Sequence, residues 1–67
     1  MSVARVTEIT ASSEKSFDDA VRIGIERANQ TLRNVKGAWI QDQTLVVDDG
    51  KITEYRVNMK ISFVLKE

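Results

Sequence analysis

The amino-acid sequence predicts an α+β protein of order β-α-β-β, in which a three-stranded antiparallel sheet packs on one helix. Three observations lead to this class. Residues 55–65 alternate between apolar and polar side chains, residues 17–33 carry apolar side chains three and four positions apart, and an Asp-Gly pair separates two strand-like segments. The last two strands are therefore expected to form a hairpin, and the first strand is expected to join them antiparallel.

The first expected strand covers residues 3–9, where β-branched side chains are frequent. A polar connector follows over residues 10–16, and three of its serines are candidate N-caps for the helix. Ser16 and Asp19 have the spacing of a capping box, with Asp in place of the preferred Glu. The helix is therefore expected to begin directly after Ser16.

The helix is expected over residues 17–33. Its apolar stripe consists of Phe17, Ala20, Val21, Gly24, Ala28 and Leu32. Two members of the stripe, Gly24 and Ala28, are small. Because a glycine inside a helix costs about 1 kcal/mol relative to alanine, we expect that the sheet backbone approaches the helix closely there.

The second half of the chain is expected to form the hairpin. Residues 34–37 end the helix, and residues 38–47 form the second strand. The apolar residues of this strand change from even to odd positions, which a β-bulge near residues 42–44 would explain. The Asp-Gly turn covers residues 48–51, and the final strand covers residues 52–66.

The final strand is the most regular element of the sequence. Its apolar residues are Tyr55, Val57, Met59, Ile61, Phe63 and Leu65, and its polar residues are Arg56, Asn58, Lys60 and Ser62. Typical strands contain about five or six residues, so one helix cannot cover a strand of this length. We expect the odd face to contact the helix, the even face to be available for subunit contacts and a ligand, and part of the hairpin to project into a partner subunit.

The chain has 67 residues, which we interpret as a single domain, 1–67. One hydrophobic core in a chain below about 70–80 residues gives marginal stability, which disulfides, a metal or oligomerisation usually supplement. The sequence contains no Cys and no His. This excludes disulfides and thiolate metal sites, and it removes the commonest zinc ligand and catalytic base. Oligomerisation is therefore the expected source of additional stability.

The charges of the chain are balanced, with ten basic and ten acidic residues. No basic patch is visible in the sequence, so we expect no nucleic-acid partner. The apolar runs are far shorter than a membrane span, and no signal-peptide pattern opens the chain. The sequence therefore predicts a soluble cytoplasmic protein with no membrane partner.

Several segments, taken in order and at matching spacing, resemble the dodecin family. They are Thr7–Ser13, Ala20–Val21, Glu26–Ala28, Thr31–Val35 and Tyr55–Phe63. The resemblance spans nearly the whole chain. It implies a small β-α-β-β subunit that assembles with copies of itself into a hollow homododecameric shell and binds flavins.

The resemblance also implies positions for the ligand site. In flavin-binding members, a Trp opens the second strand and a Gln follows the Tyr of the third strand, and flavins lie in pairs between symmetry-related Trp rings at a two-fold interface. Gly37 and Arg56 occupy these two positions here. Trp39 lies two residues after Gly37, so it shares the same strand face at a displacement of about 7 Å. Asp42 matches an acidic residue that lies near the ligand in some members.

Each candidate residue has a structural alternative. Trp39 can stack on an aromatic ligand or anchor a subunit interface. Gly37 can leave room for a ligand or end the helix. Arg56, which only donates hydrogen bonds, can bind a phosphate or carboxylate or pair with an acidic residue across an interface.

The expected function is sequestration of flavin (riboflavin or FMN) or a related aromatic molecule on Trp39, with Arg56 and Asp42 at the polar edge. The alternative is a shell that does not bind flavin and instead holds an anion or a divalent cation, or serves as a scaffold. Carboxylates at positions 42, 48, 49 and 54 could bind a hard cation, while Asp48 and Asp49 also fit turn chemistry. An enzyme is not expected, because no nucleophile lies near a His or Cys.

Overall fold

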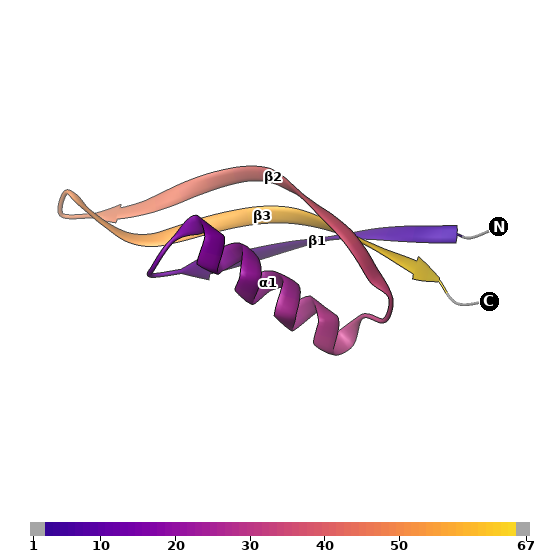
Figure 1. The fold of residues 1–67 in the computed structure, drawn as a ribbon. Helices are drawn as coiled ribbons and strands as arrows, with labels where there is room; N and C mark the ends of the chain where they lie inside the picture. The colour runs from indigo at the N-terminus through magenta and orange to yellow at the C-terminus, as the bar shows by residue number, and fades with distance from the viewer. Residues whose placement is uncertain (1–2, 66–67) are drawn as a thin grey trace.

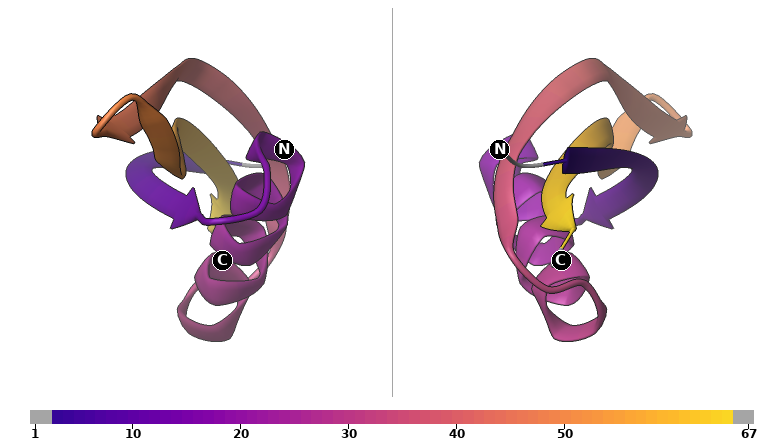
Figure 2. Two further views of the ribbon diagram at one scale, coloured as in Figure 1. Left: turned by 90° about the vertical axis from the view of Figure 1, so that its left-hand side faces the viewer. Right: turned by 90° about the vertical axis from the view of Figure 1, so that its right-hand side faces the viewer.

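The computed structural model describes residues 3–65 of the chain. The elements are β1 (Val3–Ser13), α1 (Phe17–Thr31), β2 (Val35–Asp48) and β3 (Lys51–Leu65). Figures 1 and 2 show α1 on one side of a curved three-stranded sheet. The predicted β-α-β-β order and α+β class are therefore confirmed.

The sheet has the order β1-β3-β2, and both pairings are antiparallel. The long final strand thus lies between two neighbours, and the chain itself supplies partners on both of its edges. The hairpin of β2 and β3 extends past the start of α1 (Figure 1). Three apolar side chains of this hairpin are exposed, namely Leu45, Val47 and Ile52.

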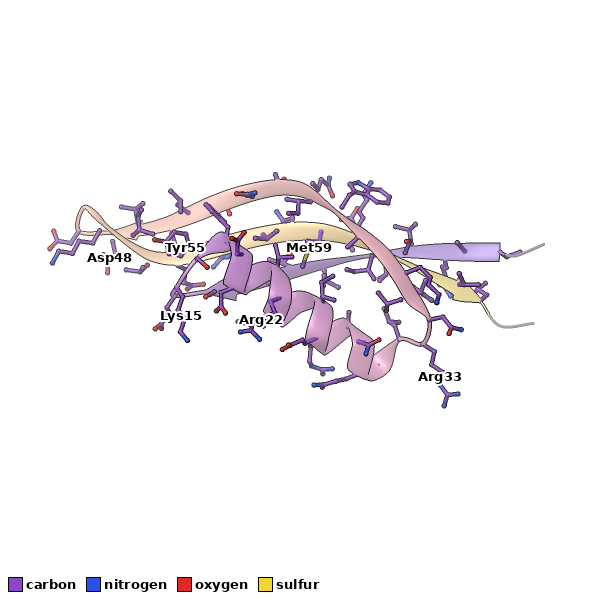
Figure 3. All side chains as sticks on the ribbon, viewed as in Figure 1. Lys15, Arg22, Arg33, Asp48, Tyr55 and Met59 are labelled. Carbon is purple, nitrogen blue, oxygen red and sulfur yellow. The ribbon has the colours of Figure 1, made fainter. Side chains whose placement is uncertain are left out.

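The core lies between α1 and the odd-numbered face of β3, as predicted. Val57, Met59 and Ile61 are at most 1% exposed, and they pack on Ala20 and Ala28 of the helix. Figure 3 shows Met59 directed toward α1, whereas Arg22 points outward from the helix. A Cβ atom at Gly24 would contact the Met59 methyl group and would lie 3.0 Å from the Ala11 Cβ. The predicted close approach therefore involves side chains of the sheet, and the expectation of a backbone contact was wrong.

Ser16 is the N-cap of α1, because its Oγ accepts a hydrogen bond from the Asp19 N–H at 3.0 Å. The reciprocal half of the predicted capping box is not formed. The Asp19 carboxylate instead accepts hydrogen bonds from Ser13 Oγ and Arg22 Nη2, both at 2.6 Å. Aspartate is one methylene shorter than the preferred glutamate, so its carboxylate bonds to nearer donors.

The hydrogen bonds from Ser13 and Arg22 lower the pKa of Asp19 below its ordinary value of 3.8. The ionised carboxylate therefore stabilises the fold at pH values above 3.8, and this contribution is lost as the pH falls through the lower pKa of the folded protein. We expect Asp19→Asn to lower the melting temperature near pH 7 and to remove part of the loss of stability below about pH 4. Thermal unfolding followed by circular dichroism tests this result.

Asp18→Asn is the matched control, because Asp18 lies in the same first turn and experiences the same helix dipole. If the two variants had the same dependence of melting temperature on pH, the role of the Ser13 and Arg22 hydrogen bonds would be refuted.

The connection from α1 to β2 is shorter than predicted. The helix ends at Thr31 rather than residue 33, and β2 begins at Val35 rather than residue 38. Asn34 reverses the chain with a φ of 60°, a conformation that Asn tolerates, and its carbonyl accepts the Val64 N–H at 3.1 Å. Gly37 therefore lies inside β2, and the alternative that it ends the helix was wrong.

β1 is longer than the predicted 3–9 because its polar end still pairs with β3. Thr10 faces Asn58 and Ser13 faces Tyr55 in the register. Backbone hydrogen bonds to the neighbouring strand thus extend β1 where its side-chain pattern is weak. The predicted end of the final strand at Lys66 lies outside the described residues.

The predicted bulge exists, but it lies earlier than residues 42–44. The register of β2 on β3 shifts between Ile40 and Asp42, which leaves Gln41 without a partner. Further shifts occur at Val35/Gly37 and at Val46/Val47. The predicted Asp-Gly turn is confirmed, with φ of 52° at Asp49 and 75° at Gly50, the positive values that a type I′ hairpin requires.

Candidate functional site

The sheet face opposite α1 carries all four predicted site residues. We call it the open face, and it consists of four rows that cross β1, β3 and β2 in this order. The rows are Val6, Ser62 and Gly37; Glu8, Lys60 and Trp39; Thr10, Asn58 and Asp42; and Ser12, Arg56 and Thr44. Sequence analysis pointed to the even face of the final strand, and these rows contain its polar residues.

The bulge at Gln41 brings Trp39 and Asp42 onto the same face. In a regular strand an odd and an even residue point to opposite sides of the sheet. If the pairing of Asp42 with Asn58 continued without a shift, Trp39 would face Ile61 on the helix side. The shift instead pairs Trp39 with Lys60. One extra residue in β2 therefore decides that the indole ring is on the open face.

Trp39 is 50% exposed, and its row contains two charged residues, Lys60 and Glu8. The Lys60 Nζ lies 5.7 Å from the ring centroid, within cation–π range. The same Nζ lies 4.0 Å from Glu8 Oε1. An exposed aromatic surface thus adjoins an ammonium group with a carboxylate on its other side.

The row beside Trp39 has no side chain at Gly37. The Ser62 Oγ donates a hydrogen bond to the Gly37 carbonyl at 3.3 Å. A Cβ at this position would lie 3.2 Å from that Oγ, which is tighter than an ordinary contact. Val6 completes the row and is 48% exposed. The surface next to the indole is therefore low and partly apolar.

The Asp42 row is joined by side-chain hydrogen bonds. Thr10 Oγ1 donates to Asn58 Oδ1 at 2.7 Å, and Asn58 Nδ2 donates to Asp42 Oδ1 at 2.5 Å. These bonds fix the orientation of the Asp42 carboxylate. A shallow depression with many oxygen atoms adjoins it, lined by Glu8, Ile9, Thr10, Gln41, Asp42 and Asn58.

Arg56 is the predicted site residue on β3, and it lies two rows from Trp39. Its Nη2 is 3.4 Å from Glu54 Oε1 of the same chain, in an exposed ion pair. Such pairs contribute about 0–1 kcal/mol, so the guanidinium is weakly held. The distance along β3 from Arg56 to Lys60 is about 13 Å. One subunit therefore does not bring Arg56 and Trp39 into a single pocket.

Sequence analysis missed the roles of Glu8, Thr10, Asn58 and Lys60. Their alternating positions indicated their face, but their partners depend on the register between strands. Within residues 3–65, no group of three or more His, Cys, Asp or Glu side chains is placed to hold a metal ion. No helix in this range is long and apolar enough to cross a membrane.

The fold and the open face define a class of protein: a small β-α-β-β binding protein with an aromatic ring and charged side chains on an open sheet face. A sequence model of the family described as Dodecin matches residues 3–66. The chain belongs to the dodecin family. Dodecins are non-enzymatic binding proteins that form homo-oligomers, so the chain is a small-ligand binding protein and not an enzyme.

Similar proteins support this assignment along the whole chain. Calcium dodecin of Mycobacterium tuberculosis is 33% identical over an alignment of 67 residues. The alignment covers 98% of this chain and 93% of that protein. Dodecin from Streptomyces davaonensis has a TM-score of 0.95 at 38% identity, covering 98% of this chain and 97% of its own. Dodecin from Streptomyces coelicolor has a TM-score of 0.94 at 33% identity, covering 98% and 94% of the two chains.

Proposed function

We propose that the protein stores or sequesters a flavin (riboflavin or FMN), or a related aromatic molecule, at two-fold sites between subunits of a hollow homododecameric shell. The single observation that carries this proposal is the half-exposed indole of Trp39 on the open face. Covering a solvent-exposed indole with an aromatic ring is favourable, because it buries apolar surface and adds a stacking contact. Residues 1–67 would form one such subunit, and we infer a cytoplasmic location from the sequence.

The neighbours of Trp39 suit a flat ligand. Gly37 leaves room beside the indole, and the exposed Val6 offers apolar surface in the same row. Ring stacking contributes about 0.5–1.5 kcal/mol beyond the burial of area. Because a two-fold axis presents every residue twice, a pair of ligands would lie between two indoles, and this packing would shield a photoreactive molecule.

Asp42 and Arg56 would contact the polar edge of the ligand. The Asp42 carboxylate is held by Asn58 and can accept a hydrogen bond from a ring N–H. The weakly paired Arg56 can donate to a carbonyl, carboxylate or phosphate group. Since Arg56 lies about two rows from Trp39 within a subunit, it would act on a ligand bound mainly by a partner's indole.

Titration of riboflavin or FMN with the purified protein tests the proposal. We expect strong quenching of flavin fluorescence at micromolar protein, because stacking on an indole provides a route for quenching. Light scattering on the same sample should give the mass of an assembly rather than 7.6 kDa. An absence of quenching would remove the flavin proposal, and a stable monomer would remove the shell.

Divalent-cation binding is a second candidate function. The oxygen-rich depression beside Asp42 favours it, as does the similarity to calcium dodecin. Hard cations prefer carboxylate, carbonyl and hydroxyl oxygens. Calorimetric binding of Ca²⁺ by the wild-type protein, abolished in Asp42→Asn, together with an absence of flavin quenching, would favour this candidate over the first.

A further inference from the structure

We infer that Lys60 sets the charge preference of the Trp39 site. The site would bind an aromatic molecule with an anionic group more tightly than its neutral counterpart. This inference rests on the proposed binding of an aromatic ligand at Trp39. It adds the chemical class of the substituent, and it assigns that preference to a residue outside the four predicted ones.

The position of Lys60 supports this role. It is the direct cross-strand partner of Trp39, and its Nζ lies 5.7 Å from the centroid of the indole. The ammonium group therefore lies close to any ring that stacks on the indole. Arg56 of the same subunit is about 13 Å away along the strand, and its weak pairing with Glu54 leaves it available to a ligand at a partner's indole, as proposed above.

The present partners of Lys60 hold it weakly. Its distance to Glu8 Oε1 is 4.0 Å, the outer limit of an ion pair, and the Glu8 side chain is 66% exposed. The cation–π contact at an exposed ring is also weak. The lysine stem is flexible and carries three donors, so the ammonium can turn toward a phosphate or carboxylate on the ligand and form a charge-assisted hydrogen bond there.

The other groups that face Lys60 do not provide this selection. Glu8 on β1 and Asp42 in the adjacent row on β2 both repel an anion, and Asn58 and Ser62 flank Lys60 on β3 without charge. Trp39 on β2 contributes the ring alone. Among the described residues of its row and the adjacent rows, Lys60 thus supplies the positive charge.

FMN and riboflavin form a matched pair of probes, because they share one ring system and differ by a phosphate group. We expect the wild-type assembly to bind FMN roughly tenfold more tightly than riboflavin at low ionic strength, the effect of one charge-assisted hydrogen bond. The preference should shrink in about 0.5 M NaCl, where exposed charges are screened. Quenching titrations give both dissociation constants.

Variants assign the preference to the side chain. Lys60→Met keeps the unbranched stem and should bring the ratio of the two constants close to one, whereas Lys60→Arg should retain the preference. Glu8→Gln should increase it, because the competing carboxylate is gone. Lys51→Met removes the same charge at the hairpin turn, about 30 Å away along β3, and should leave the ratio unchanged.

The outcomes separate this inference from the proposal on which it rests. If riboflavin and FMN bind equally well to the wild type at low salt, or if the preference survives Lys60→Met, the role of Lys60 is refuted while flavin binding stands. If neither flavin is quenched, both the flavin proposal and the inference fall. The wild-type salt dependence gives this answer even if a variant does not assemble.

Discussion

Trp39→Ala is expected to weaken flavin binding by at least about 30-fold, which corresponds to roughly 2 kcal/mol. The indole offers the large apolar surface on the open face, and alanine removes the stacking contact together with the area that the ligand would bury. At a two-fold site the loss occurs on both sides of a ligand pair. Fluorescence quenching titrations with riboflavin measure the change.

Two further variants serve as controls for Trp39→Ala. Ile40→Ala truncates the next residue of β2, which is 44% exposed but faces the helix side, and should leave riboflavin affinity near the wild-type value. Trp39→Phe keeps an aromatic surface and should give an intermediate affinity. Unchanged quenching by Trp39→Ala, in a sample whose mass by light scattering equals that of the wild type, would show that the indole serves a subunit interface instead.

Met59→Ala is expected to reduce the free energy of unfolding by about 2–5 kcal/mol, the range for truncation of a buried methionine. Met59 is 1% exposed and fills the space between the centre of β3 and Gly24 of α1. A single core in a chain of this size supplies roughly 3–5 kcal/mol. Urea denaturation should therefore show that the variant is largely unfolded unless assembly stabilises it.

Further variants test whether the volume of the Met59 side chain, rather than its thioether group, is what stabilises the core. Met59→Leu conserves most of the volume and should cost less than about 1.5 kcal/mol. Adding Gly24→Ala to Met59→Ala places a methyl group in the vacated space and removes the cost of a helical glycine. The new Cβ lies 3.0 Å from the Ala11 Cβ, which must move by a few tenths of an ångström, so the double variant should regain part of the stability that Met59→Ala loses. A Met59→Ala variant as stable as the wild type would contradict the central place of Met59 in the core.

The local parts of the fold were predictable from the sequence. The alternation of β3 identified its buried face, because burial of that face against α1 requires Val57, Met59 and Ile61 to be apolar. The turn was predictable for a similar reason, since Asp49 and Gly50 adopt the positive φ values that the residue types tolerate. In both cases the pattern that reveals the structure lies within a short stretch of the chain.

The contacts between strands were not predictable in the same way. Trp39 faces Lys60 only because the register shifts at Gln41, and nothing in the local sequence fixes which residue of β2 is left unpaired. The extension of β1 to Ser13 likewise depends on hydrogen-bond partners in β3. For the same reason, the four site residues could be assigned to a strand face by analogy, but the roles of Glu8 and Lys60 needed the register.

The central position of β3 also has a consequence for folding during synthesis. Val3 pairs with Leu65, so the first described residue of the sheet can pair only after the last has been synthesised. β1 and β2 are not neighbours, so a nascent chain that has not yet produced β3 contains no two strands that pair in the folded sheet. Its helix of 15 residues is marginal alone. The sheet therefore forms only after β3 (Lys51–Leu65) has been synthesised, in one step dominated by distant contacts, the kind of topology that folds slowly.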